Sequence, residues 1–169
     1  VQPIILDCTL RDGGYYNKWD FPSEIIDSYL YAMSKVNVDV VEIGFRSKLN
    51  TEYKGACAYS REDFLATLDI PSNLLISVML NASELVSSED QISLIDDLFP
   101  VSVEYSKVDI VRIACNHIEV ANVLQSVNRL SELGYRVAIN LMQVFSMTED
   151  LISDLIAIIN TSKAEVVYF

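Results

Sequence analysis

The sequence predicts an α/β fold, and within that class it favours a truncated (β/α)8 barrel, the TIM barrel. Six short apolar segments alternate with segments of helical periodicity along residues 1–169. Successive strands start roughly 30 to 35 residues apart, which is the length of a parallel βαβ unit. A complete barrel needs about 250 residues, so we expect about the first five and a half βα units here and two more strands in the full protein.

The six expected strands are apolar runs of four to eight residues that are bounded by turn or capping residues. In the first expected strand, apolar and polar residues alternate as far as Arg11, so that one face of the strand is polar. It is expected to break at Gly13-Gly14, a pair permissive of positive φ. The strands are expected at residues 4–10, 39–45, 74–80, 108–114, 135–142 and 165–169.

Five helices are expected between these strands. Serine and threonine residues at their starts predict N-caps, and Gly134 after the fourth helix is typical of a left-handed stop. Pro71 and Pro100 follow the second and third helices, which they cannot continue. The helices are expected from Ser23, from Ser60 to Leu68, from Ser87 or Ser88 to Phe99, from His117 to Leu133, and from Thr148 to Asn160.

Polar residues within the strands favour the barrel over an open doubly wound sheet. A barrel interior is lined by alternate residues of every strand, whereas both faces of a doubly wound sheet are covered by helices. Charged residues on such a covered face would be buried at high cost. The residues expected to face the interior are Asp7, Thr9, Arg11, Glu42, Ser77, Arg112 and Asn140.

Composition limits the partners of the chain. The net charge is −12 without a cluster of Lys or Arg, which excludes an electrostatic nucleic-acid footprint and disfavours anionic membranes. No run of about 18 apolar residues and no secretory signal pattern occurs, so we expect a cytoplasmic protein. Three widely spaced cysteines, Cys8, Cys57 and Cys115, form neither a disulfide framework nor a C-x-x-C site. Cys8 and Cys115 lie in apolar runs and are expected in the core.

Three motifs carry a resemblance to a known family. They are D-C-T-L-R-D-G at Asp7–Gly13, V-E-I-G-F at Val41–Phe45 and V-R-I-A at Val111–Ala114. Taken in the order of the strands that carry them, these motifs resemble those of the metal-dependent aldolase and Claisen-condensing family. That family includes 4-hydroxy-2-oxovalerate aldolase, hydroxymethylglutaryl-CoA (HMG-CoA) lyase, isopropylmalate synthase and pyruvate carboxyltransferase domains. The chain is most similar to the oxovalerate aldolases, which implies that residues 1–169 are the N-terminal part of an aldolase-type catalytic domain.

The resemblance implies a role for each motif residue. Arg11 stabilises an enolate oxygen, Asp12 binds a divalent metal, and Glu42 supports the site. Cleaving a carbon–carbon bond next to a carbonyl leaves an enolate, whose oxygen needs a metal or a fixed cation. Arg11 offers a planar fork of donors, and Asp12 offers the hard oxygen ligand that Mg²⁺ or Mn²⁺ prefers.

Two departures from the family pattern are visible. The family completes its metal site with a His-x-His pair on the seventh strand, and this chain has one histidine, His117. We therefore expect this piece to lack those ligands, to bind metal weakly and to be inactive alone. The histidine expected as general base corresponds here to Tyr15. Tyr15 or Tyr16 could donate or relay a proton as a catalytic residue, but unperturbed tyrosine titrates near 10 and is a weaker base near neutrality.

Each functional interpretation has a structural alternative. Arg11 and Asp12 could form an ion pair at a strand end, and Glu42 could pair with Arg11 or Arg112. Arg112 and Asn140, candidates for substrate binding, could be members of an interior polar network. Tyr15, Tyr16 and Trp19 could form a lid or cover the barrel mouth, and His117 is expected on the surface or in the first turn of its helix.

The leading hypothesis is a divalent-metal-dependent aldolase or lyase acting on a 2-oxo or 3-hydroxy acid. Acyl-CoA condensation or carboxyl transfer is the nearest enzymatic alternative, with an acyl-CoA-type substrate. A non-catalytic binding or regulatory domain is the alternative from another class. We also expect a homo-oligomer, because a sheet that stops at six strands exposes two edges, and the resemblance adds a partner dehydrogenase in the full enzyme.

Overall fold

The computed structural model describes residues 3–49 and 51–169. The chain divides into two compact units. The first comprises the chain up to Met79 together with Ser106–Asp109, and the second comprises Leu80–Tyr105 and Ile110–Phe169.

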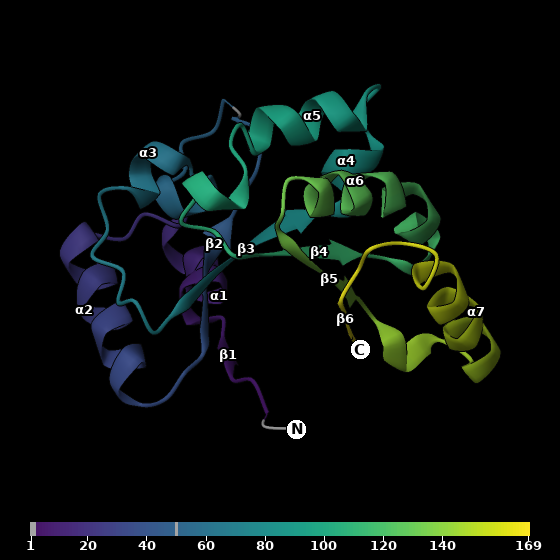
Figure 1. Cartoon of the computed structure of the whole chain (residues 1–169), viewed down its shortest axis with the longest axis horizontal. Helices are drawn as coiled ribbons and strands as arrows, with labels where there is room; N and C mark the ends of the chain where they lie inside the picture. The colour runs from purple at the N-terminus through teal and green to yellow at the C-terminus, as the bar shows by residue number, and fades with distance from the viewer. Residues whose placement is uncertain (1–2, 50) are drawn as a thin grey trace. The chain divides into compact units, whose positions relative to one another are not determined.

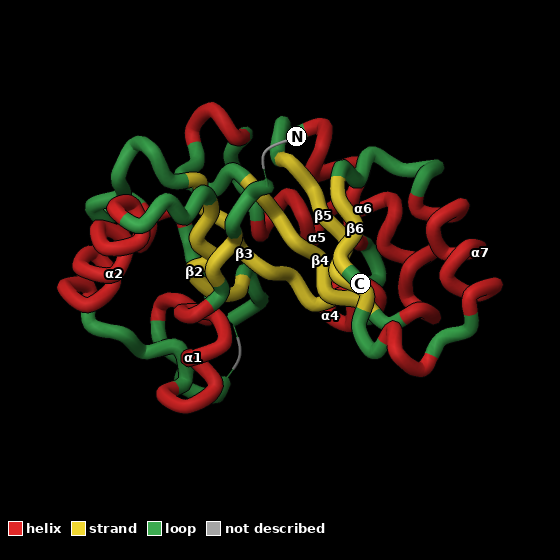
Figure 2. Tube along the Cα trace, turned by 90° about the horizontal axis from the view of Figure 1, so that it is seen from below, coloured by secondary structure: helices red, strands yellow, loops and turns green. Residues whose placement is uncertain are grey.

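The first unit is built on three parallel strands that are hydrogen-bonded in chain order. These are β1 (Leu6–Asp7), β2 (Val40–Phe45) and β3 (Leu75–Asn81). Its helices are α1 (Thr9–Asn17), α2 (Ser23–Lys35), the 3₁₀ turn η1 (Ala56–Ala58) and α3 (Glu62–Leu65). Helix α1 packs against β2 and η1, next to the yellow strands in Figure 2.

The second unit also has three parallel strands in chain order. These are β4 (Ile110–Cys115), β5 (Arg136–Leu141) and β6 (Val166–Tyr168). Its helices are α4 (Ala82–Val86), α5 (Gln91–Leu98), α6 (Val120–Glu132) and α7 (Glu149–Ile159). Short 3₁₀ turns are η2 (Val103–Tyr105), η3 (His117–Glu119) and η4 (Val144–Ser146). Helix α6 contacts α4, α5 and α7 (Figure 1).

The strand predictions are confirmed in both units. Each expected strand from the second to the sixth is present with its ends shifted by a few residues, and all pairing is parallel. Within each unit the pairing follows chain order, whereas a doubly wound sheet reverses its order about its first strand. Six parallel strands that alternate with helices are the arrangement expected of part of an α/β barrel.

The first strand is the main error of the sequence prediction. Only Leu6 and Asp7 are extended, and the expected strand end is instead α1, which contains both Gly13 and Gly14. Neither glycine has a positive φ; the left-handed residues are Lys18 and Trp19, just after the helix. The strand-like alternation of Thr9 and Arg11 was therefore misread, and these residues follow helical spacing.

Helix starts were predicted with mixed success. Thr148 caps α7 by accepting a hydrogen bond from the backbone of Leu151, and Gly134 follows α6 with a φ of 90°, both as expected. Ser23 is the first residue of α2 rather than its cap. The helix expected from Ser87 or Ser88 is two helices, because these serines close α4 and Asp90 caps α5.

The expected helix at residues 60–68 shortens to α3, with η1 before it. His117 lies exposed in the turn before α6, as expected.

The core is apolar apart from a few buried polar side chains, among them Glu42, Arg46 and Arg112. Cys57 and Cys115 are buried, and burial raises the pKa of each thiol to about 12, helped by nearby carboxylates. Cys8, also expected in the core, is only half-buried because it lies in the turn between β1 and α1. No helix within residues 3–49 and 51–169 has both the length and the apolar content needed to cross a bilayer.

We predict that Asp90→Ala lowers the free energy of unfolding by about 1 kcal/mol, because its side chain accepts a hydrogen bond from the Ser93 amide at 3.0 Å and caps α5. Urea unfolding measures this. Asp97→Ala is the matched control, since Asp97 is an exposed residue near the other end of α5, where a negative charge is unfavourable. Equal destabilisation by both variants would contradict the capping role.

Candidate functional site

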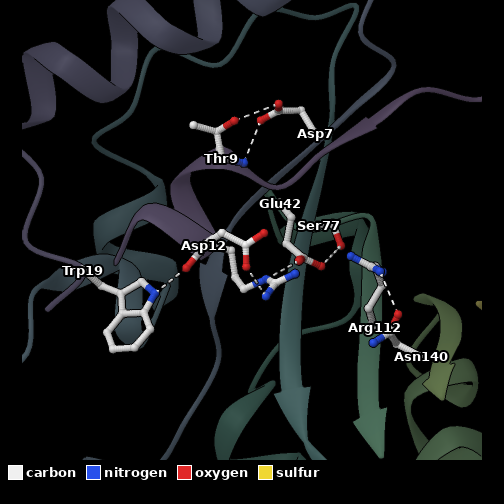
Figure 3. Close-up of polar contacts among 9 residues, drawn as sticks. Asp7, Thr9, Asp12, Trp19, Glu42, Ser77, Arg112 and Asn140 are labelled. Atoms are coloured by element: carbon white, nitrogen blue, oxygen red, sulfur yellow. Dashed lines mark hydrogen bonds and ion pairs between the residues drawn. The ribbon is translucent and has the colours of Figure 1, made fainter. Parts of the chain in front are cut away.

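Asp7 is the first residue of the site along the chain, and it lies at the end of β1, just before α1. Its carboxylate accepts hydrogen bonds from the amide and the hydroxyl of Thr9, each at 3.0 Å, and from the Tyr29 hydroxyl of α2. The Thr9 amide is one of the N-terminal helix donors that need a side-chain partner. Asp7 is therefore a capping residue, and Figure 3 shows its carboxylate turned toward Thr9.

Arg11 and Glu42 form the centre of the site. Arg11 Nε donates to Glu42 Oε1 at 2.9 Å, and the Ser77 hydroxyl donates to Glu42 Oε2 at 3.4 Å. Glu42 is fully buried, and it lies opposite Ser77 in the register of β2 and β3. A buried carboxylate requires such partners, so Arg11 and Ser77 stabilise its charged form. The sequence left open whether Glu42 pairs with Arg11 or with Arg112, and the structure pairs it with Arg11.

Asp12 lies on the exposed side of the same guanidinium. Arg11 Nη1 donates to Asp12 Oδ1, and the Asp12 side chain is 60% exposed. Burial acts to lower the pKa of Arg11, but the hydrogen bond and charge of Glu42 and the charge of Asp12 raise it above its usual value. The guanidinium therefore stays cationic between two carboxylates, and its Nη2 amino group donates to no residue in the described part of the chain.

Tyr15, the expected position of the general base, lies one turn after Arg11 on α1. Its ring contacts the edges of Trp19 and Phe45, with centroid distances of 4.8 and 6.3 Å, and it is 66% exposed. Tyr16 is almost fully exposed, whereas Trp19 is 9% exposed and packs inward.

The sequence analysis named Trp19 only as part of a lid or cover and missed its contact with Arg11. Its indole Nε1 donates to the backbone oxygen of Arg11 at 2.8 Å (Figure 3). A helical reading of residues 9–17 would have offered a signal, because Leu10 and Gly14 then share one face at a spacing of four. Both are buried, and Gly14 leaves space that the indole fills.

Arg112 and Asn140 come together in the second unit. Arg112 on β4 is 5% exposed, and its Nη2 donates to Asn140 Oδ1 on β5 at 3.2 Å. Tyr168 on β6 adds an aromatic face, with the guanidinium carbon 4.4 Å from its ring centroid. Adjacent strands supply the three side chains. Asn140 is the register partner of Tyr168, and it lies two residues after the register partner of Arg112 on the same strand. No sequence pattern indicated a role for Tyr168, because its contact with Arg112 depends on the strand register.

The described residues do not form a complete metal site. In residues 3–49 and 51–169, no three His, Cys, Asp or Glu side chains are grouped so that they could hold a metal ion. Asp12 is one exposed carboxylate, and it pairs with the cation of Arg11. One carboxylate alone does not hold a divalent ion.

The chain is similar in structure to one solved domain that bears on its function. A search of solved structures finds the N-terminal domain of "a putative aldolase" from Bacteroides vulgatus, with a TM-score of 0.76 and 26% sequence identity. The match covers 97% of this chain and 62% of that chain, so this chain spans less than two thirds of the other. No model of a protein family matches the chain, and no curated protein matches it.

We predict that Glu42→Gln lowers the free energy of unfolding by about 3 kcal/mol, because it removes the charge that compensates Arg11 at a buried position. Chemical unfolding of the wild type and of Glu42→Gln measures this loss. Glu52→Gln is the matched control, since Glu52 pairs with Lys18 on the surface at 3.2 Å and such pairs contribute about 1 kcal/mol or less. Equal losses would show that burial does not strengthen the Arg11 contact.

We also predict a late-titrating phenol at Tyr29. Burial raises its pKa to about 12, and the hydrogen bond to Asp7 adds to this. Because the folded pKa lies above the unfolded value near 10, the stability from protonated Tyr29 is complete below pH 10 and is lost as the pH rises through 12. Absorbance titration of tyrosinate measures it.

Tyr29→Phe should remove one phenol that titrates near pH 12, whereas Tyr31→Phe, on the exposed side of α2, should leave it. An unchanged titration in Tyr29→Phe would contradict the assignment.

Proposed function

We propose that this chain carries the enolate-stabilising half of an aldolase site, in which Arg11 binds the developing oxyanion. The observation that supports it is the guanidinium of Arg11, held by the buried carboxylate of Glu42 with Nη2 left for a ligand. The similarity to an aldolase domain and the D-C-T-L-R-D-G motif support the same reaction class. The substrate class is a 2-oxo or 3-hydroxy acid.

The chemistry follows from the geometry of Arg11. Breaking the carbon–carbon bond next to a carbonyl moves its electron pair toward the carbonyl oxygen, which becomes the enolate oxygen. The hydroxyl carbon of the other fragment becomes a carbonyl, and its hydroxyl proton passes to a base. A donor that is fixed before the reaction stabilises this charge without reorganising. Glu42 fixes Nε and Asp12 contacts Nη1, so the fork of Arg11 has one orientation from which Nη2 can donate.

A divalent ion, Mg²⁺ or Mn²⁺, is part of this proposal for the full protein. Arg11, Asp12 and Glu42 together carry a net charge of −1, which a cation at Asp12 would offset. The carboxylate of Asp12 is exposed and could contribute one oxygen ligand. The remaining ligands would have to come from elsewhere than the residues described here.

Arg112 and Asn140 are proposed as substrate-binding residues in the second unit. A guanidinium stacked on an aromatic ring has restricted freedom, and its planar fork matches the carboxylate that a 2-oxo acid provides. The finer expectations of HMG-CoA lyase-like or carboxyltransferase chemistry, acyl-CoA substrates, a homo-oligomer, a partner dehydrogenase and a cytoplasmic location stay predictions.

The test is aldol cleavage by the full protein across a panel of 2-oxo acids with Mg²⁺ or Mn²⁺. We expect Arg11→Lys to lower kcat about a hundredfold, because lysine keeps the charge but loses the fork. Asp12→Asn should lower metal affinity and turnover, and Asn140→Ala should raise KM more than it lowers kcat.

The matched control is Arg129→Lys. Arg129 also bridges two carboxylates, Asp96 and Glu132, but on a helix surface, so its change should leave turnover intact. Activity untouched by Arg11→Lys would refute the assigned role. Binding of 2-oxo acids without turnover in the wild type would favour a non-catalytic binding domain.

A further inference from the structure

Trp19 packs tightly against α1 next to Arg11, within the first unit. A Cβ atom added at Gly14 would lie 1.9 Å from the Trp19 ring, a distance that real side chains do not reach. The indole therefore occupies the place of a side chain on α1, and its Nε1 reaches the Arg11 carbonyl at 2.8 Å. The only residue that permits this packing at position 14 is glycine.

The backbone around Trp19 is held in a costly conformation. Lys18 and Trp19 have φ values of 61° and 59°, in the left-handed region that residues with a Cβ rarely adopt. The Trp19 amide donates to Gly14 O at 3.0 Å and to Asn17 Oδ1 at 3.1 Å, which closes the end of α1. Strain of this kind persists where the surrounding contacts determine it.

A neighbouring loop also contacts the backbone and the ring of Trp19. Gly55 donates its amide to Lys18 O at 2.8 Å, and a Cβ at Gly55 would lie 2.3 Å from Trp19 O. Lys54 places its ammonium 5.5 Å from the indole centroid, and Phe45 on β2 meets the indole edge-on with a centroid distance of 5.4 Å. The indole is thus fixed to β2, the strand that carries Glu42.

We propose that Trp19 is a positioning residue for Arg11: its indole N–H holds the Arg11 backbone so that the guanidinium stays aligned with Glu42. The contact fixes the main chain of Arg11, and the bond from Nε to Glu42 fixes the other end of the side chain. Trp19 touches no reacting atom in this role. This inference rests on the role proposed for Arg11, and its test has a readout apart from turnover.

The experiment measures solvent exchange of the Arg11 Nε–H proton by ¹⁵N NMR, with the signal assigned by its loss in Arg11→Lys. Trp19→Phe keeps an aromatic ring but removes the indole donor. We expect exchange at Arg11 Nε–H to accelerate about tenfold or more in this variant, which corresponds to weakening of a single hydrogen bond. In the full protein, kcat should fall more than KM rises.

Matched variants separate positioning from simple stability. Gly14→Ala should displace the indole and accelerate the same exchange, whereas Gly13→Ala should not, because its Cβ would meet only Phe21 at an ordinary 3.6 Å. Phe45→Leu should lower the unfolding midpoint while it leaves the donor in place and Arg11 Nε–H protected.

The outcomes distinguish this inference from the proposed function. Unchanged Arg11 Nε–H exchange in both Trp19→Phe and Gly14→Ala would overturn the positioning role, even if the wild type cleaves a 2-oxo acid. Equal acceleration of Arg11 Nε–H exchange in Phe45→Leu and in Trp19→Phe would mean that the exchange only follows the loss of stability. This result would also overturn the positioning role. Accelerated exchange in Trp19→Phe with no turnover in the wild type would support positioning and refute the aldolase proposal.

Discussion

The burial of Glu42 is the constraint on which the rest of the first unit depends. A carboxylate with no exposed surface in the middle of β2 costs several kcal/mol unless charged and polar partners compensate it. Ser77 contributes a hydroxyl from the register position opposite, and Arg11 contributes the opposite charge. Arg11 can reach inward only because α1 starts directly after β1 and packs against β2. The position of α1 and the charge of Glu42 are therefore coupled.

The same coupling explains the unusual composition of α1. Gly13 and Gly14 make it a weak helix by propensity, at a cost of about 1 kcal/mol for each glycine relative to alanine. The capping carboxylate of Asp7 at its start and the indole of Trp19 at its end offset this loss. The helix forms because tertiary contacts hold it, and those contacts also orient Arg11.

This dependence on tertiary contacts limited what the sequence could predict. The strands around Glu42 and Arg112 were placed correctly because apolar periodicity is a local property, and Thr148 and Gly134 gave local signals for helix ends. Helix α1 gave none: its glycines indicate a turn and its alternation indicates a strand. The pair of Arg11 and Glu42 was one of two pairings that the sequence left open for Glu42, whereas the contacts of Trp19 and Tyr168 required knowledge of which atoms meet.

The cysteines have a consequence for covalent labelling. Only a thiolate attacks an alkylating reagent at a useful rate, and burial keeps the thiols of Cys57 and Cys115 protonated, with pKa values of about 12. Cys8 is half-buried and lies between the capping residue Asp7 and the start of α1. Maleimide or iodoacetamide reagents should therefore select Cys8. A fluorophore or spin label could then be installed three residues before Arg11 without a cysteine-free background.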